Sequence, residues 1–230
     1  KRALRNDMPA QPVMEAEIKS IPLQQVEKQT TVDFVIDLPY TINSDNKSYT
    51  VTMANYSLPA NYQYYSLPKV EKESFLISSI NDWEKYNLLE GEANIFFENT
   101  FIGKTVLDVR YASDTLDISL GRDKNLTINR EKITDFSSKK FVGTRKEESR
   151  AWKITVKNNK SEAINMLLLD QVPVSIRDEI KVDIEELTGG KHNTQTGEIK
   201  WELKLNPGEE KVFTLRYTVK YPRNQNLIIE

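Results

Sequence analysis

Tyrosines are the first residues in this sequence whose types and spacing could do chemistry. Tyr62 and Tyr64 stand two positions apart, with Tyr56 and Tyr65 close by. Residues two apart share one face of a strand, where aromatic rings could stack on sugar rings while their hydroxyls bond the rim. The alternative is that Tyr62 and Tyr64 pack on one face of a strand while Tyr65 fills the core on the other. Tyr62 and Tyr64 are therefore candidates for carbohydrate binding.

Asp123 and Arg130 form a second candidate pair. Asp123 begins a turn after Gly121, and Arg130 follows seven residues later, so a hairpin could bring carboxylate and guanidinium into a charge-assisted pair. We expect a structural salt bridge, with a ligand-binding role as the alternative. If the pair is partly buried, removing one partner leaves a costly unpaired charge.

Residues suited to catalysis or metal binding are scarce. The single histidine, His192, lies in a polar turn, and we expect it to be exposed and poorly held against a nucleophile. The absence of cysteine excludes disulfides, thiolate nucleophiles and cysteine-bound zinc. Adjacent acidic residues such as Glu147 and Glu148 point to opposite faces of a strand, and the loop around Asp45 offers calcium one carboxylate. We predict no catalytic residue, no metal site, no cofactor and no enzymatic activity.

The charge balance argues against nucleic acid as a partner. The chain has 32 basic and 34 acidic residues, a net charge of -2, whereas phosphate binding needs a basic excess or patch. The basic clusters at 139–140 and 145–146 run directly into two glutamates, and we interpret them as solvated surface. The longest apolar run, Met166 to Leu169, is too short to span a bilayer. Because the chain starts at Lys1 instead of methionine, we expect a mature or excised piece.

Hydrophobic periodicity places these residues on strands. Prolines 9, 12 and 22 predict an extended linker over residues 1–29. Residues 31–38 and 48–53 then alternate around a turn at 43–46 and predict a hairpin. Further strand-length segments, separated by turn residues, span 62–67, 74–80, 93–98, 101–109, 115–120, 126–130, 151–157, 163–171, 180–186, 199–205 and 211–221. This pattern predicts an all-β fold with antiparallel β-sandwich architecture.

The last third of the chain carries the clearest strand pattern. Trp201 belongs to an alternating strand that ends in Asn206-Pro207-Gly208, where proline presets the first turn position and glycine accepts the positive φ of the second. This part is typical of an immunoglobulin or fibronectin-III sandwich, with Trp201 as core anchor. We therefore expect a linker, or the end of an upstream helical segment, over 1–29, a first β domain over 30–148 and an immunoglobulin-like sandwich over 149–230.

Several motifs resemble one family. The run Leu89 to Lys104 and the segment Ser119 to Asp123 with Arg130 are similar to the domain of unknown function DUF4139. The later segments 154–159, 170–175, 201–209 and 217–222 extend the resemblance in the same order. That domain forms the C-terminal part of the mucoidy inhibitor A family. The resemblance implies an upstream N-terminal domain, a coiled-coil-like segment and an exported bacterial protein, and no catalytic residues can be carried over.

These expectations define a binding module of unknown function. We expect an extracytoplasmic location, in the periplasm or at the cell surface, and protein–protein or scaffold interactions with an unknown envelope protein. The alternative is recognition of a glycan such as exopolysaccharide, which the tyrosines and the family name favour. A hydrolase that uses acidic residues is the third class. A deep cleft with two facing carboxylates would favour the hydrolase, and a broad apolar patch would favour a protein partner.

Overall fold

The structure is a computed structural model that describes residues 23–27, 32–36, 41, 43–48, 52, 54–108 and 114–229. The chain divides into two compact units, residues 1–57 and 58–230. In the first unit, β1 (Leu23–Glu27) pairs antiparallel with β2 (Val32–Ile36). The second unit contains the remaining strands and is described by itself.

The first unit differs from the expected linker and hairpin. Residues 23–27 form a strand because the three prolines of the expected linker all precede Leu23 and leave this stretch free to pair. The expected strand over 31–38 is present as β2, but its partner is β1. Most of the other predicted partner, 48–53, lies outside the described residues.

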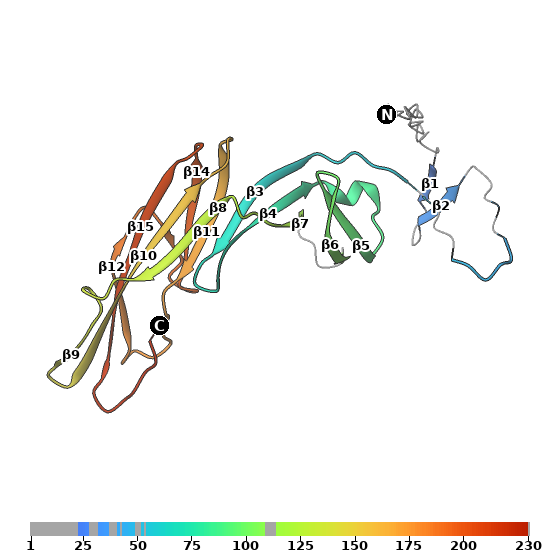
Figure 1. Ribbon diagram of the computed structural model, residues 1–230. Helices are drawn as coiled ribbons and strands as arrows, with labels where there is room; N and C mark the ends of the chain where they lie inside the picture. The colour runs from blue at the N-terminus through green and yellow to red at the C-terminus, as the bar shows by residue number, and fades with distance from the viewer. Residues whose placement is uncertain are drawn as a thin grey trace, which may run out of the picture. The chain divides into compact units, whose positions relative to one another are not determined.

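The second unit is built almost entirely of strands (Figure 1). Each predicted strand beyond residue 60 has a counterpart there, and the structure adds the short strands β9 and β13 and one 3-10 helix. The elements are β3 (Ala60–Leu67), β4 (Glu71–Asn81), η1 (Trp83–Tyr86), β5 (Gly91–Phe97), β6 (Thr100–Leu107), β7 (Thr115–Arg122), β8 (Leu126–Lys132), β9 (Ser138–Val142), β10 (Arg145–Asn158), β11 (Ile164–Gln171), β12 (Lys181–Leu187), β13 (Lys191–His192), β14 (Glu198–Leu205) and β15 (Glu210–Pro222).

Two sheets face each other across the main core. The six-stranded sheet has the order β13-β14-β11-β3-β4-β7, and the five-stranded sheet has the order β12-β15-β10-β8 with β9 paired to β10. Alternating residues of both sheets meet in one buried cluster, for example Ile154 and Leu215 from one sheet and Met166 and Trp201 from the other. The all-β sandwich prediction is therefore confirmed. Among the strands of the described residues, all pairs are antiparallel except β3 with β11, which is parallel.

Trp201 is a core anchor, as predicted. Its ring is 2% exposed, its Nε1 donates to the Thr188 carbonyl at 2.7 Å, and it lies 5.4 Å from the Phe213 ring. The turn that follows its strand also has the predicted chemistry, since Gly208 has a φ of 71° and Glu209 N bonds to Asn206 O.

The expected domain boundary between residues 148 and 149 lies inside β10. Strands from both sides of this position share each sheet, because β3, β4 and β7 extend the sheet of β11 and β14, while β8 and β9 join β10. The structure divides the chain at residues 57 and 58 instead. The strands after 149 therefore share their sandwich with earlier strands of the chain.

Candidate functional site

The predicted site residue Asp123 lies in a polar triad with Tyr64 and Lys160. Lys160 Nζ donates to Asp123 Oδ2 at 2.8 Å and lies 2.8 Å from Tyr64 Oη, which donates to the same carboxylate at 2.8 Å. The three residues come from β3, from the β7–β8 connection and from the turn after β10. The triad therefore joins three segments that are distant in sequence.

The electrostatics of this triad are those of a structural ion pair. Burial alone would raise the pKa of Asp123, but hydrogen bonds from Lys160, from the Asn125 backbone and from Tyr64 outweigh burial and hold the pKa below its usual range. Burial alone would lower the pKa of Lys160, but the contacts with Asp123 and Tyr64 hold it above its usual range. Both groups stay charged near neutral pH, whereas a general acid or base needs a pKa near the working pH. The triad suits stabilisation better than proton transfer.

The predicted site residue Arg130 pairs with a residue that sequence reasoning missed. Its Nε donates to Asp170 Oδ2 at 2.8 Å, and its guanidinium carbon lies 3.7 Å from the Trp152 ring centroid. The Arg130 side chain is 9% exposed and that of Asp170 is 0% exposed. The sequence did contain a signal for this pair, because Asp170 directly follows the apolar run 166–169. An aspartate in a core strand requires a charged or hydrogen-bonding partner.

The predicted pair between Asp123 and Arg130 is therefore wrong. The segment between them is not a hairpin, since β7 pairs with β4 in one sheet and β8 pairs with β10 in the other. The chain crosses between the sheets just after Asp123, and each side chain finds a partner elsewhere.

The two candidate tyrosines lie in different environments. Tyr64 is 6% exposed and belongs to the core, whereas Tyr62 is 57% exposed. Tyr64 is therefore a packing residue, and the pair does not form a joint aromatic platform. Tyr62 lines a hollow of about 820 Å³ at the place where β3 diverges from β11, here called the fork. The fork is lined by Ala60, Asn61, Tyr62, Gln63, Ser79, Asn165, Glu202, Leu203 and Lys204.

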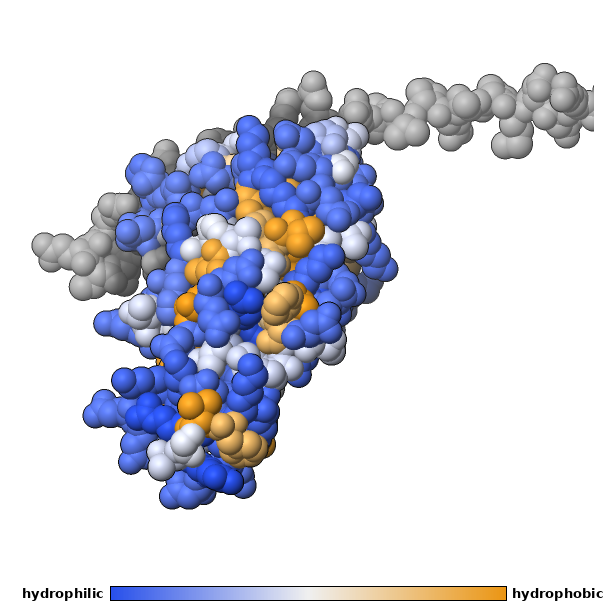
Figure 2. All heavy atoms as spheres, turned by 90° about the vertical axis from the view of Figure 1, so that its left-hand side faces the viewer, coloured by the Kyte–Doolittle hydropathy of each residue, from blue (hydrophilic) through white to orange (hydrophobic). Residues whose placement is uncertain are grey.

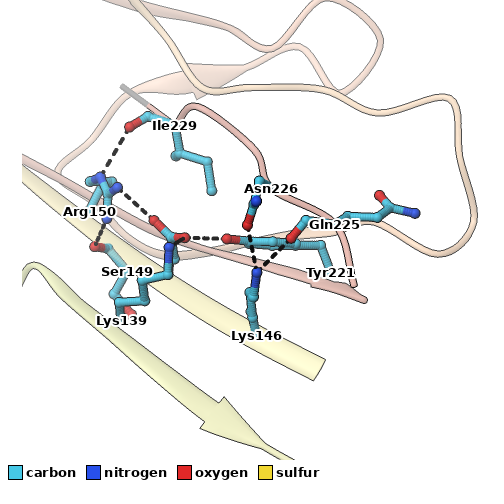
Figure 3. Close-up of polar contacts among 9 residues, drawn as sticks. Lys139, Lys146, Ser149, Arg150, Tyr221, Gln225, Asn226 and Ile229 are labelled. Carbon is cyan, nitrogen blue, oxygen red and sulfur yellow. Dashed lines mark hydrogen bonds and ion pairs between the residues drawn. The ribbon is translucent and has the colours of Figure 1, made fainter. Parts of the chain in front are cut away.

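A buried charge cluster around Glu148 was also missed (Figure 3). Glu148 is 4% exposed and accepts hydrogen bonds from Lys139 at 2.7 Å, from Arg150 at 2.8 Å and from the Tyr221 hydroxyl. Burial alone would raise the pKa of Glu148, but the bonds from Lys139, Tyr221 and Arg150 together lower it to about 2. Near neutral pH, Glu148 therefore carries its negative charge inside the protein, next to the positive charges of Lys139 and Arg150.

The same cluster fixes the C-terminal segment, residues 223–229. Lys146 Nζ donates to the Gln225 carbonyl at 2.7 Å and to Asn226 Oδ1 at 2.8 Å, and Arg150 Nε reaches the Ile229 carbonyl at 3.3 Å (Figure 3). The segment thus covers the end of the five-stranded sheet, where the inward positions of β10 are charged.

The interpretation of the charged run around residues 145–148 as solvated surface, and of His192 as exposed, is therefore wrong in part. Lys146 and Glu148 are buried, not solvated, because the C-terminal segment covers the face of β10 on which they lie. His192 is half buried on β13 instead of exposed in a turn, since Lys191 and His192 pair with β14.

The most exposed aromatic pair lies on the ribbon formed by β5 and β6. Phe96 and Phe101 are paired across the strands, 64% and 53% exposed, with ring centroids 5.5 Å apart in an edge-to-face arrangement. Val106 is 68% exposed on the second strand. The loop residues Glu98 and Asn99 have φ values of 47° and 60°, the geometry of a tight type I′ hairpin turn.

The opposite face of the ribbon anchors it to the protein. Phe97 packs against the main core, and Leu107 packs against a smaller cluster of Ile80, Trp83 and Leu116. A two-stranded hairpin alone is marginally stable, so these contacts hold one face while the phenylalanines stay in solvent.

The face of the protein drawn in Figure 2 has a divided apolar surface. Figure 2 shows small apolar patches separated by polar residues on the face it presents. Two other exposed aromatics, Phe136 and Phe141, each have a guanidinium about 5 Å from the ring centroid, from Arg216 at 5.3 Å and Arg223 at 5.2 Å respectively. These rings are partly engaged within the protein, in contrast to the ribbon pair.

Metal-binding geometry is absent from the part of the chain that the structure describes, where no three His, Cys, Asp or Glu side chains gather around a common point. Over the same residues, no helix has the length and apolar character needed to cross a membrane.

The structure thus defines an all-β sandwich protein with buried ion pairs and an exposed aromatic ribbon. Comparison with known proteins then gives the family. The family described as "Domain of unknown function (DUF4139)" matches residues 4–223, so the chain belongs to the DUF4139 family.

One curated relative is Protein F37C4.5 of Caenorhabditis elegans. It is 23% identical over 211 residues, which cover 86% of this chain and 38% of that protein. The chain thus spans less than half the length of this relative. The resemblance to DUF4139 is confirmed, while the link to mucoidy inhibitor A stays a prediction.

Proposed function

We propose that this chain is a non-enzymatic binding module that docks a protein partner on the solvent face of the ribbon. The observation that carries the proposal is the exposed, cross-strand pair of Phe96 and Phe101. Aromatic residues, phenylalanine included, are enriched in the buried centres of protein interfaces. Exposed apolar groups gathered on one element mark such a surface.

Charge and polarity around the pair support a protein partner. Glu92, Asn94 and Lys104 are exposed on the same two strands and flank the apolar residues. An apolar centre with a polar rim is the usual arrangement of a protein interface. The carboxylates of Asp123, Glu148 and Asp170 are held in ion pairs, which supports a binding role over catalysis. The expected extracytoplasmic location and bacterial origin stay predictions.

The proposal is tested by capture with the full chain and matched variants. The wild-type chain should capture a partner saturably from extracts of the source cells. The double variant Phe96→Ser with Phe101→Ser should no longer capture it. Phe136→Ser with Phe141→Ser, which changes two aromatics of similar exposure, should leave capture intact. The captured protein is then purified and titrated against each variant. A partner whose affinity is equal for the wild type and the ribbon variant would refute docking on the ribbon.

A further inference from the structure

An apolar pocket next to the C-terminal segment continues the main core. Its volume is about 380 Å³, within the size range of ligand pockets, roughly 300–1,000 Å³. Two of its lining residues, Val182 of β12 and Val219 of β15, are paired across the strands, and both pack in the core between the sheets. Tyr217 lies two residues before Val219, on the same inward face, and also lines the pocket. The pocket therefore opens into the space between the two sheets.

The C-terminal segment forms another wall of this pocket. Leu227 and Ile229 line it and pack against the core, and Arg150 Nε bonds the Ile229 carbonyl at 3.3 Å (Figure 3). Val174 and Ile228 also line the pocket, yet they are 49% and 100% exposed. Eight of the eleven lining residues are aliphatic or proline. A hollow with such a lining, open to water, favours an apolar ligand.

Lys69, in the turn between β3 and β4, is the one charged residue among the described residues that line the pocket. It is half buried, and no acidic side chain of the described ranges forms an ion pair with it. Two other lysines that are not exposed do have acceptors, Asp123 for Lys160 and the Gln225 carbonyl for Lys146. A partly buried ammonium gains from an anionic partner. Lys69 therefore favours a ligand with a negative charge.

The polar side chains of the pocket are too few for a peptide. A peptide backbone brings one donor and one acceptor with each residue, and each needs a partner when it is buried. Besides Lys69, the polar side chains of the lining are those of Ser175 and Tyr217. Ser175 Oγ already bonds the backbone of Arg177, and Tyr217 is 2% exposed. A hydrocarbon chain with one anionic end needs a single polar partner, which Lys69 supplies.

We propose that this pocket binds a fatty acid, with the hydrocarbon chain on the apolar lining and the carboxylate at Lys69. This binding is separate from protein docking on the ribbon, because none of the described lining residues belongs to β5 or β6.

The test is calorimetric titration of the full chain with dodecanoate, decanoate and dodecyltrimethylammonium, each below its micelle concentration. Dodecanoate should bind. Decanoate, which has two CH₂ groups fewer to bury, should have a Kd about fifteenfold higher. Dodecyltrimethylammonium has the same chain with a positive head, and it should bind at least about tenfold more weakly than dodecanoate because Lys69 repels it.

Two pairs of variants locate the ligand. Lys69→Met keeps the aliphatic stem, removes the charge and should raise the Kd of dodecanoate about tenfold. Lys181→Met is its control, since Lys181 is exposed next to Val182 on the opposite face of β12. Val174→Trp should fill the pocket and abolish binding. Ile176→Trp, at a fully exposed position outside the lining, should bind dodecanoate as the wild type does.

Two results would overturn the proposal. One is that dodecanoate does not bind at millimolar concentration. The other is that it binds folded Lys69→Met or folded Val174→Trp as tightly as the wild type. Because Val174 is 49% exposed and Lys69 is half buried in a turn, each variant should keep the melting temperature of the wild type, which excludes misfolding as the cause of lost binding.

Discussion

At the scale of single residues, Glu148 makes the most specific prediction. Its pKa of about 2 lies below the usual value of 4.5, so its stabilising contribution is complete above pH 4.5 and is lost as the pH falls towards 2. Glu148→Gln should lower stability at pH 7, by up to about 3 kcal/mol, and flatten the loss of stability between pH 4.5 and 2. Urea unfolding across this pH range measures both effects.

The neighbouring residue provides the control. Glu147 lies on the opposite face of the same strand and is half buried. Glu147→Gln, which removes no contact of the cluster, should lower the free energy of unfolding at pH 7 by less than Glu148→Gln does. If Glu148→Gln and the wild type have the same slope, the charge of Glu148 does not contribute as the cluster implies.

The sequence predicted the alternation of Glu147 and Glu148 but not which of them is buried. A period of two places adjacent side chains on opposite faces, and the face is chosen by whatever covers it. Here the cover is the C-terminal segment, which Lys146 and Arg150 hold by its carbonyls. Local patterns do not contain such contacts between distant residues. The same reason explains why Asp170 and Lys160 were missed as partners.

At the scale of elements, the buried pair of Arg130 and Asp170 joins the two sheets, since Arg130 lies on β8 and Asp170 on β11. Asp170→Asn leaves a buried guanidinium without its counter-charge and should lower the free energy of unfolding by about 3–5 kcal/mol. Arg130→Met with Asp170→Leu removes both charges and should cost less than Asp170→Asn alone. Chemical denaturation of the single and double variants measures both values.

The double variant separates the cost of an unpaired charge from the loss of the pair itself. If the pair were solvated, Asp170→Asn would cost under about 1 kcal/mol, as surface ion pairs do. That result would contradict a buried link between the sheets.

Strand existence was predictable and strand pairing was not. Alternation located the strands of the second unit, and the turn at Asn206-Pro207-Gly208 was predicted with its geometry. β13 was missed because it has two residues, too few for a period, and β9 because its sequence, Ser-Lys-Lys-Phe-Val, does not alternate. The parallel contact between β3 and β11 joins segments about 100 residues apart, and no local signal encodes it. The fork, which depends on that contact, was equally hidden.

At the scale of the whole molecule, the second unit combines segments that the sequence assigned to two domains. β10 is 14 residues long and spans the expected boundary, while β8 and β15 pair along its length. The composition of the chain does not change at this point, so only long-range pairing reveals a single unit.

Family membership was predictable, because the motifs occur in order along the chain, and the DUF4139 match covers residues 4–223.

The central claim is that a protein partner docks on the ribbon, and site-specific photocrosslinking tests it most directly. A photoreactive phenylalanine analogue is placed at Phe96, and in a matched variant at Phe141, which has similar exposure. We predict one discrete crosslinked protein from position 96, competed by excess unlabelled chain, and none from position 141. A crosslink that forms from position 141 and not from position 96 would contradict the claim.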